Sequence, residues 1–252
     1  MTHERRAAPR GVVVNWPAPA RVRAAFTTRC GGVSNRPWAS LNLASHVGDD
    51  PLAVASNRAA LVASLGVRHE PCWLEQIHSD ILLNLDDPTC ARRGDAAITS
   101  VPGRIATVLV ADCLPVLLCD RQAQQVAAVH AGWRGLAGEL IAKTVSAFGA
   151  PPADLIAWLG PAIGPSAYAV GDDLRARFVA LDARNARAFQ RIAQQWHMDL
   201  AAVAALQLAA AGVTAVSASG VCVHGDAQNY FSYRRDGETG RMAAMVWLQD
   251  SA

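Results

Sequence analysis

Three short apolar runs limit what this chain can fold into. They occupy residues 105–110, 115–119 and 126–129, and turn-forming residues such as Gly, Pro and Asp stand near their ends. A continuous apolar run of this length indicates a strand buried inside the protein, because a buried helix usually needs a longer segment. We therefore expect a fold built around a β-sheet core.

Helical segments alternate with these strands. Asp50 can cap a helix, and Pro51 fits the first turn of a helix that runs to Gly66. Further helices are expected at residues 135–148, 172–181 and 199–211, and further strands at residues 72–77, 96–99, 155–159, 213–217 and 242–248. No linker, charge block or repeat divides the chain. The alternation predicts one α+β domain at residues 12–252, with mixed β-sheets flanked by helices, after a disordered tail at residues 1–11.

The composition indicates a cytoplasmic protein with a large core. Hydrophobic residues make up 52% of the 252 residues, and charged residues only 17%, against roughly 25% in average soluble domains. No apolar run approaches the ~18 residues that a membrane span needs, and the charged N-terminus lacks the apolar stretch of a signal peptide. The net charge of +2 gives no reason to expect nucleic acid or an acidic membrane as a partner.

A cysteine and two histidines mark a candidate active site. Cys113 lies between the first two apolar runs, and His130 directly follows the third and precedes Gly132. Polar side chains at the ends of buried strands, beside glycine that lets a ligand approach the backbone, are common in active sites. His78 follows another short run. Two histidines and one cysteine form a donor set that zinc uses, with a fourth position open for water or substrate.

The spacing of these residues leaves other interpretations open. His78, Cys113 and His130 are far apart in the sequence, so only the fold can bring them together. Each taken singly is more often structural, as a hydrogen-bonded histidine or a small buried thiol. Cys113 could instead be a nucleophile with His130 as its base, and Asp112 could complete a thiol hydrolase or amidase. In the zinc interpretation, Asp112 is a proton acceptor or supports a ligand.

Arginines in glycine-rich or turn-like segments are candidates for binding anions. They are Arg29, Arg134 and the pair Arg234 and Arg235, and a planar guanidinium suits phosphate or carboxylate. Each could equally be solvated or paired with an aspartate. His46, near a helix start, could help to hold an anion there. The glycine-rich segments match neither a P-loop nor a dinucleotide fingerprint, which argues against a nucleoside triphosphate or NAD enzyme.

Short segments along the chain together resemble one known family. In order, these segments are Thr27–Ser34, Asn42–Leu43, His46–Asp49, Gln76–Ser79, Asp95–Ala96, Ala111–Val116, His130–Gly135, Gly160–Pro165 and Ser232–Gly237. The set resembles the bacterial YfiH family, also called the laccase-domain or multicopper polyphenol oxidase family. Its members are also named purine nucleoside phosphorylase and peptidoglycan editing factor. The resemblance extends from about Phe26 to Leu248.

The resemblance implies a fold and a set of site residues. It implies a single α+β domain, related in architecture to bacterial toxin deamidases that use a Cys–His pair. In this family one zinc is held by three residues that match His78, Cys113 and His130 without substitution. The candidate substrate- and phosphate-binding residues in the matching segments are Arg29, Asn42, His46, Arg134 and Arg234.

The activities assigned to the family differ, and residue chemistry helps to rank them. They are phosphorolysis of adenosine, inosine and 5′-methylthioadenosine with adenosine deamination, copper-dependent oxidation of phenols, and removal of a wrong amino acid from a UDP-MurNAc cell-wall precursor. A multicopper oxidase needs many histidines, often in His-x-His pairs, whereas this chain has seven histidines and no such pair. A single zinc with an open position suits deamination, because it acidifies water.

We therefore expect a zinc-dependent purine nucleoside phosphorylase with adenosine deaminase activity. Its partners would be a small nucleoside and phosphate, and its catalytic residues Cys113, Asp112 and His130. The cell-wall precursor amidase is the alternative, and the copper-dependent polyphenol oxidase is the least favoured of the three.

Overall fold

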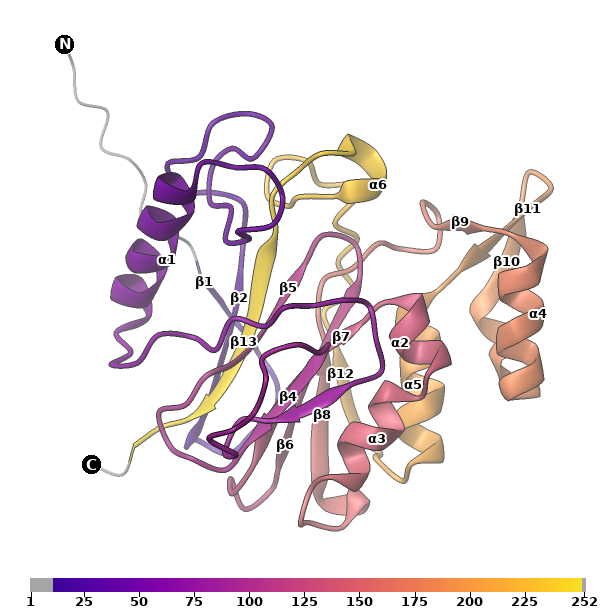
Figure 1. Cartoon of the computed structure of the whole chain (residues 1–252). Coiled ribbons are helices and arrows are strands. Elements are labelled where there is room, and N and C mark those ends of the chain that lie inside the picture. Colours follow the sequence, from indigo (N-terminus) through magenta and orange to yellow (C-terminus); the bar gives the residue numbers. More distant parts are fainter. Residues whose placement is uncertain (1–10, 251–252) are drawn as a thin grey trace.

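Two sheets packed face to face form the centre of the fold (Figure 1). The structure is a computed structural model that describes residues 11–250. The first sheet has the strand order β1 (Gly11–Val13), β2 (Val22–Thr27), β13 (Met242–Leu248), β5 (Ala106–Val110). The second has the order β12 (Ala215–Ala218), β8 (Leu155–Leu159), β6 (Leu114–Asp120), β7 (Val126–Ala131), β4 (Ala96–Thr99), β3 (Leu82–Asn84). The second sheet is mixed, as expected, because β12 runs parallel to β8 and β3 parallel to β4.

The central strands are covered on both faces. In β6, Leu117 and Cys119 pack toward the first sheet, whereas Val116 and Leu118 pack against the helices on the other side. These helices are α2 (Trp133–Ala137), α3 (Leu140–Ser146) and α5 (Leu200–Ala210), while α1 (Pro51–Leu65) covers the outer face of the first sheet. Burial on both faces explains why these strands are continuous apolar runs in the sequence.

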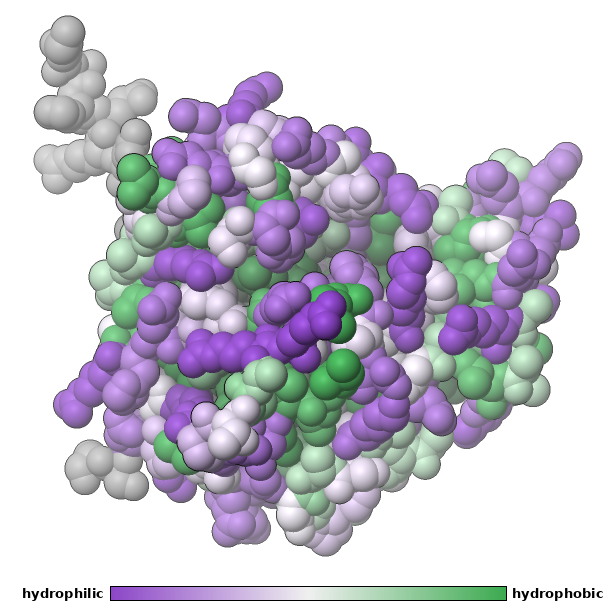
Figure 2. Space-filling model, in the orientation of Figure 1, coloured by the Kyte–Doolittle hydropathy of each residue, from purple (hydrophilic) through white to green (hydrophobic). Residues whose placement is uncertain are grey.

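A small lobe projects beside these helices, at the right of Figure 1. It comprises α4 (Asp172–Leu181), the turn η2 (Ala183–Ala188) and a three-stranded sheet of β10 (Phe189–Ile192), β11 (Gln195–Met198) and β9 (Ala169–Val170). Phe178, Phe189 and Met198 join the lobe to the main core. Figure 2 shows hydrophilic side chains standing between the lobe and the main body. Within residues 11–250, no helix is long and apolar enough to cross a membrane.

Most predicted elements are confirmed, including α1. Its cap Asp50 accepts a hydrogen bond from the Leu52 N–H at 2.9 Å, and Gly66 ends the helix with a left-handed backbone. The prediction of a single helix at 135–148 is wrong, because this segment forms the two helices α2 and α3. Glu139, between them, has a φ of 60°. Gly138 lies so close to Asp80 that a Cβ on the glycine would stand 2.7 Å from the Asp80 side chain.

The other differences concern segments whose structure depends on distant partners. The strand predicted at 72–77 makes only isolated bridges, from Cys72 to Ala106 and from Glu75 to Arg93. Strand β3, the lobe sheet and the short helix α6 (Tyr233–Asp236) were not predicted. Gly11, expected within the tail, belongs to β1, and residues 1–10 of that expected tail lie outside the described residues.

Candidate metal centre and its cavity

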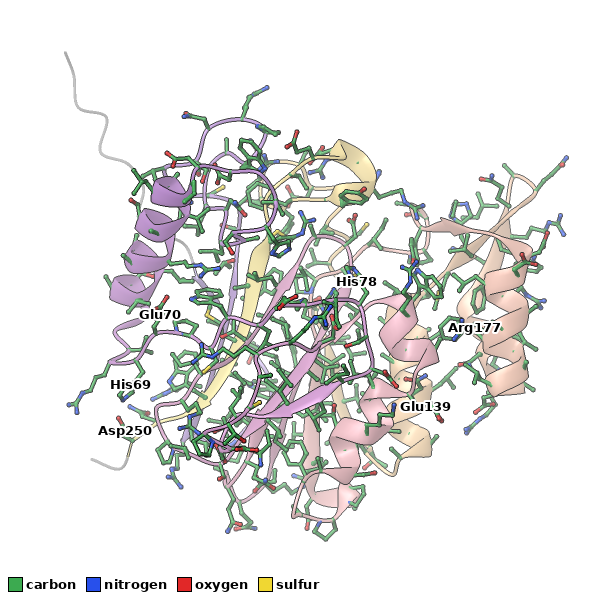
Figure 3. The ribbon with its side chains drawn as sticks, viewed as in Figure 1. His69, Glu70, His78, Glu139, Arg177 and Asp250 are labelled. Atoms are coloured by element: carbon green, nitrogen blue, oxygen red, sulfur yellow. The ribbon has the colours of Figure 1, made fainter. Side chains whose placement is uncertain are left out.

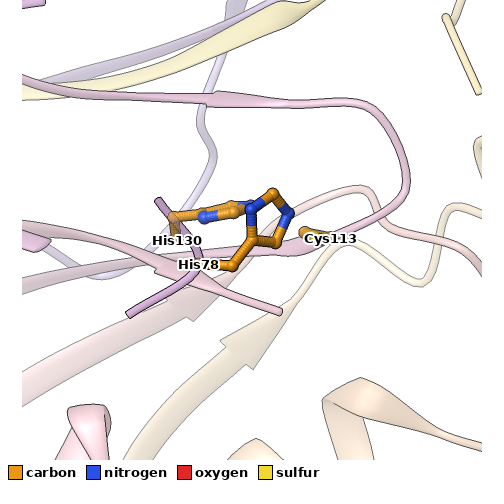
Figure 4. A group of neighbouring side chains, drawn as sticks. All are labelled: His78, Cys113 and His130. Atoms are coloured by element: carbon orange, nitrogen blue, oxygen red, sulfur yellow. The ribbon is translucent and has the colours of Figure 1, made fainter. Parts of the chain in front are cut away.

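His78, Cys113 and His130 meet at one end of the six-stranded sheet (Figure 4). Cys113 directly precedes β6 and His130 lies near the end of β7, and the antiparallel pairing of these strands sets Pro115 opposite His130. His78 reaches the same point from the loop before β3. The ligand atoms of the three side chains lie within 4.8 Å of one another, and the two imidazole rings meet edge to face with centroids 4.9 Å apart.

Asp95, at the start of β4, holds two of these residues in place. Its fully buried carboxylate accepts hydrogen bonds from His130 Nδ1 at 2.8 Å and from the His78 backbone N–H at 3.0 Å. It also accepts from the N–H and hydroxyl of Ser79, at 2.6 and 2.7 Å, and from the Ile77 N–H at 3.2 Å. Because Nδ1 of His130 faces this carboxylate, Nε2 is the nitrogen left for a metal or a thiol.

The backbone around the three residues adopts unusual conformations. His78 has a φ of 57° and Asp112, next to Cys113, a φ of 94°, and such values are uncommon for residues other than glycine. Gly132 lies so close to the site that a Cβ on it would stand 3.0 Å from Cys113 Sγ and 3.7 Å from the His78 ring. The glycine at this position therefore keeps the space between the thiol and the imidazole open.

The electrostatics of the site favour an ionised thiol beside a charged imidazole. Burial raises the pKa of Cys113, but the charge of His130 and hydrogen bonds with both histidines outweigh burial and lower it to about 6. Burial lowers the pKa of His130, but Cys113 and Asp95 outweigh it and raise the value to about 9. Burial likewise opposes ionisation of Asp95, yet hydrogen bonds from His130 and Ser79 hold its pKa at about 2.

The three side chains open into a cavity of about 480 Å³, a size typical of small-molecule sites. Its wall is both aromatic and cationic. The aromatic residues are Trp133, Tyr168 and Tyr233, and the cationic or titratable ones are His46, Arg134, Arg234 and Arg241. Burial lowers the pKa of His46, and the nearby charges of Arg241 and Arg58 lower it further.

Three of the predicted substrate-binding residues line this cavity, and two do not. His46, Arg134 and Arg234 are part of its wall. Arg29 instead donates to the carbonyls of Ala39 and Ala227, at 2.9 Å each, and packs over an aromatic ring. Asn42 is fully buried and bonds the backbone of its own loop, Asp49 and the Arg241 N–H. Arg29 and Asn42 therefore contact the chain rather than the cavity.

Asp112 lines the cavity but has a structural partner. Its carboxylate accepts from the Ser232 hydroxyl and from the Arg234 N–H, at 2.6 Å each. These contacts fix the start of α6 against the loop that carries Cys113. The side chain that orients His130 is Asp95 rather than Asp112.

Sequence reasoning did not single out Asp95, Arg241 or Tyr168. Asp95 stands out in the sequence only as part of a matching segment, because β4, β5 and β6 separate it from the strand that carries His130. Arg241 reaches the cavity from just before β13, and Tyr168 from the start of the lobe. The sequence gives no signal for Arg241 or Tyr168, since neither lies in a motif whose residue types by themselves indicate a binding or catalytic role.

Comparison with known proteins identifies the family. A family model described as multi-copper polyphenol oxidoreductase laccase matches residues 23–249. The chain belongs to this laccase-like YfiH family. It is 48% identical to a purine nucleoside phosphorylase of Pseudomonas aeruginosa, over 94% of this chain and 97% of that one. It is 44% identical to the purine nucleoside phosphorylase YfiH of Escherichia coli, over 94% of this chain and 98% of that one.

Solved structures of the YfiH family show the same fold. A crystal structure of a Neisseria meningitidis protein matches with a TM-score of 0.90 and 42% identity, covering 95% of this chain and 99% of that one. YlmD from Geobacillus stearothermophilus matches with a TM-score of 0.88 and 30% identity, covering 99% and 98% of the two chains. The predicted α+β fold of the YfiH type is thereby confirmed.

Proposed function

We propose that this YfiH-family chain is a zinc-dependent purine nucleoside phosphorylase that also deaminates adenosine. The observation that carries the proposal is the convergence of His78, Cys113 and His130 at the base of a cavity with a cationic and aromatic wall. The names of the Pseudomonas and Escherichia relatives support the same activity.

The donor set fits zinc. Two imidazoles and one thiolate leave a fourth position open, as in catalytic zinc sites. A tetrahedral zinc with ordinary bond lengths needs these donors about 3.3–3.6 Å apart. The donors here lie within 4.8 Å of one another, so they would have to approach by at most about 1.5 Å to hold the ion. Zinc bound there would supply a Lewis acid that acidifies water or polarises a substrate atom.

The residues of the chain would bind and orient the two substrates. The rings of Trp133, Tyr168 and Tyr233 offer faces on which a purine can stack. Arg134, Arg234 and Arg241 offer charged N–H donors for phosphate. Phosphate bound beside the ribose would attack C1′ and displace the purine base, whereas deamination needs water beside C6 of the purine ring, with ammonia as the leaving group.

The same geometry disfavours a multicopper oxidase. Within residues 11–250, the three residues His78, Cys113 and His130 are the one group of three or more Cys, His or acidic side chains close enough to share a metal. A multicopper oxidase needs a type 1 copper and a three-copper cluster, and therefore many more ligands.

A cell-wall precursor amidase is the second candidate, and one observation favours it. Cys113, His130 and Asp95 stand in the order of a nucleophile, a base and an orienting carboxylate. If no metal occupied the site, the thiolate could attack an amide carbonyl, and His130 could donate a proton to the leaving amine.

Metal content and phosphate dependence separate these functions. Protein purified in metal-free buffers is expected to hold about one zinc per chain and to release adenine from adenosine only when phosphate is present. Cys113→Ala should lose both zinc and adenine release, while Cys90→Ala, a cysteine outside the cavity, should keep both. Full zinc occupancy and wild-type phosphorolysis in Cys113→Ala would refute the assignment. A zinc-free protein that releases an amino acid from a cell-wall precursor would favour the amidase.

A further inference from the structure

Arginines and aromatic rings alternate along the side of the cavity that faces the lobe. The guanidinium carbon of Arg134 lies 4.3 Å from the ring centroid of Trp133, and that of Arg177 lies 5.9 Å from the same centroid. Arg234 stands 5.0 Å from the ring of Tyr168. Trp133, Tyr168, Arg134 and Arg234 all line the cavity, and Arg177 approaches it at the ring of Trp133.

These arginines come from three separate elements. Arg134 belongs to α2 and Arg234 to α6, whereas Arg177 extends from α4 of the lobe, where Figure 3 labels it between α4 and α2. Arg177 does not line the cavity itself. An anion that contacts both Arg177 and a residue of the cavity wall must therefore extend out of the cavity toward the lobe.

No carboxylate of the described residues forms an ion pair with any of the three. The ion pairs present involve Arg93, Arg104, His130, Lys143, Arg184 and Arg235. On the lobe, Asp182 is engaged with Arg184, and Asp173, one helical turn before Arg177, makes no ion pair with it.

The free charges and their stacking suit a phosphate chain. The guanidinium carbons of Arg134 and Arg177 lie 4.3 and 5.9 Å from one indole centroid and are therefore at most about 10 Å apart, which is about the Debye length at 0.1 M salt, so an anion that contacts both would relieve their repulsion. A guanidinium stacked on a ring keeps N–H groups at its edge for the hydrogen bonds that phosphate oxygens accept. Arg234 already donates one of these, from Nη1, to the Ala169 carbonyl at 3.0 Å, and has further N–H groups for an anion.

We propose that this arginine rim, formed by Arg134, Arg177 and Arg234, binds the phosphate chain of a purine nucleotide whose base occupies the cavity. This inference rests on the proposed function, because it assumes that the cavity binds a purine. It adds that the protein also recognises a phosphate ester on the same ligand. Because Arg177 does not line the cavity, contact with it and with the cavity wall requires an anion longer than orthophosphate, such as the diphosphate of a nucleotide. Binding through arginines needs no P-loop, in keeping with the sequence.

A binding measurement on the zinc-loaded protein tests the rim independently of turnover. Isothermal titration would compare ADP, UDP, pyrophosphate and adenosine. ADP is expected to bind at least about tenfold more tightly than adenosine, since charge-assisted hydrogen bonds to phosphate are among the stronger polar contacts. Arg177→Gln should remove most of that ratio and Arg177→Lys only part of it. The matched control Arg187→Gln, also exposed on the lobe but with no aromatic contact, should leave the ratio unchanged.

The outcomes separate the rim from the proposed activity. The rim is refuted if ADP binds no more tightly than adenosine, or if Arg177→Gln binds ADP as the wild type does. UDP binding as tightly as ADP would overturn the purine part of this proposal and would also count against the proposed function, while leaving the phosphate contacts of the rim in place. If the protein releases no adenine from adenosine but still prefers ADP in a way that depends on Arg177, the proposed phosphorylase activity is refuted and the arginine rim is supported.

Discussion

Replacing Asp95 by Asn tests how the metal centre is held together. The buried carboxylate accepts five hydrogen bonds, two at Oδ1 and three at Oδ2. An asparagine must place its NH₂ group at one of these oxygen positions. At the Oδ1 position it loses the bonds from the His78 N–H and from His130 Nδ1–H. At the Oδ2 position it loses the bonds from the Ile77 and Ser79 N–H groups, while the Ser79 hydroxyl can turn to accept, so two bonds are lost in either case.

The expected loss is large. Hydrogen bonds to a charged group contribute about 1.5–3 kcal/mol each, and removing one partner of a buried pair costs about 3–5 kcal/mol. We therefore expect Asp95→Asn to lower the free energy of unfolding by about 3–5 kcal/mol. Zinc affinity should fall by about 10- to 100-fold, because His130 loses the partner that fixes its ring and its tautomer.

Urea denaturation and competition with a chelator measure the two effects. Asp120→Asn is a matched control, since Asp120 is also buried and accepts backbone N–H groups of Gln122, Gln124 and Gln125 at the far end of β6. It should lose stability while keeping zinc affinity within about twofold of the wild type. The reasoning fails if folded Asp95→Asn binds zinc as tightly as the wild type, or if Asp120→Asn weakens zinc binding equally.

Three further predictions follow from the geometry. Gly132→Ala should weaken zinc binding about tenfold, because the new Cβ would stand 3.0 Å from Cys113 Sγ. The control in the same chelator assay is Gly171→Ala, whose Cβ would have no atom within 4 Å. The folded pKa of Asp95 is about 2 against 3.8 for the free group. Its stabilisation of about 2 kcal/mol is therefore present above about pH 4 and is lost as the pH falls toward 2. A difference in unfolding free energy between wild type and Asp95→Asn that does not shrink from about pH 5 to about pH 3 contradicts this. Gly160→Ala should lower the free energy of unfolding by about 1–3 kcal/mol, since its Cβ would lie 2.7 Å from a proline and an indole; an unchanged urea midpoint would show that the close packing relaxes freely.

Local sequence predicted the secondary structure where the signal was itself local. The apolar runs of β5, β6 and β7 and the capped helix α1 agree with the structure, because burial, capping and turn chemistry act over a few residues. The split between α2 and α3 could not be predicted, since it depends on Asp80 approaching Gly138 from another part of the chain. The lobe hairpin was missed because its strands have only four residues each and β10 is mostly exposed.

The sequence by itself singled out the three candidate metal ligands, since motif chemistry and family resemblance both pointed to His78, Cys113 and His130. Only the tertiary structure decided that they meet, because their separations along the chain carry no distance information. It also decided which carboxylate supports them. Asp112, adjacent to Cys113 in sequence, turns toward Ser232, whereas Asp95 reaches His130 through the pairing of β4 with β7. Adjacency in the sequence does not fix where a side chain points: Asp112 has a φ of 94° and hydrogen-bonds to Ser232 and to the Arg234 N–H instead of to a histidine of the site.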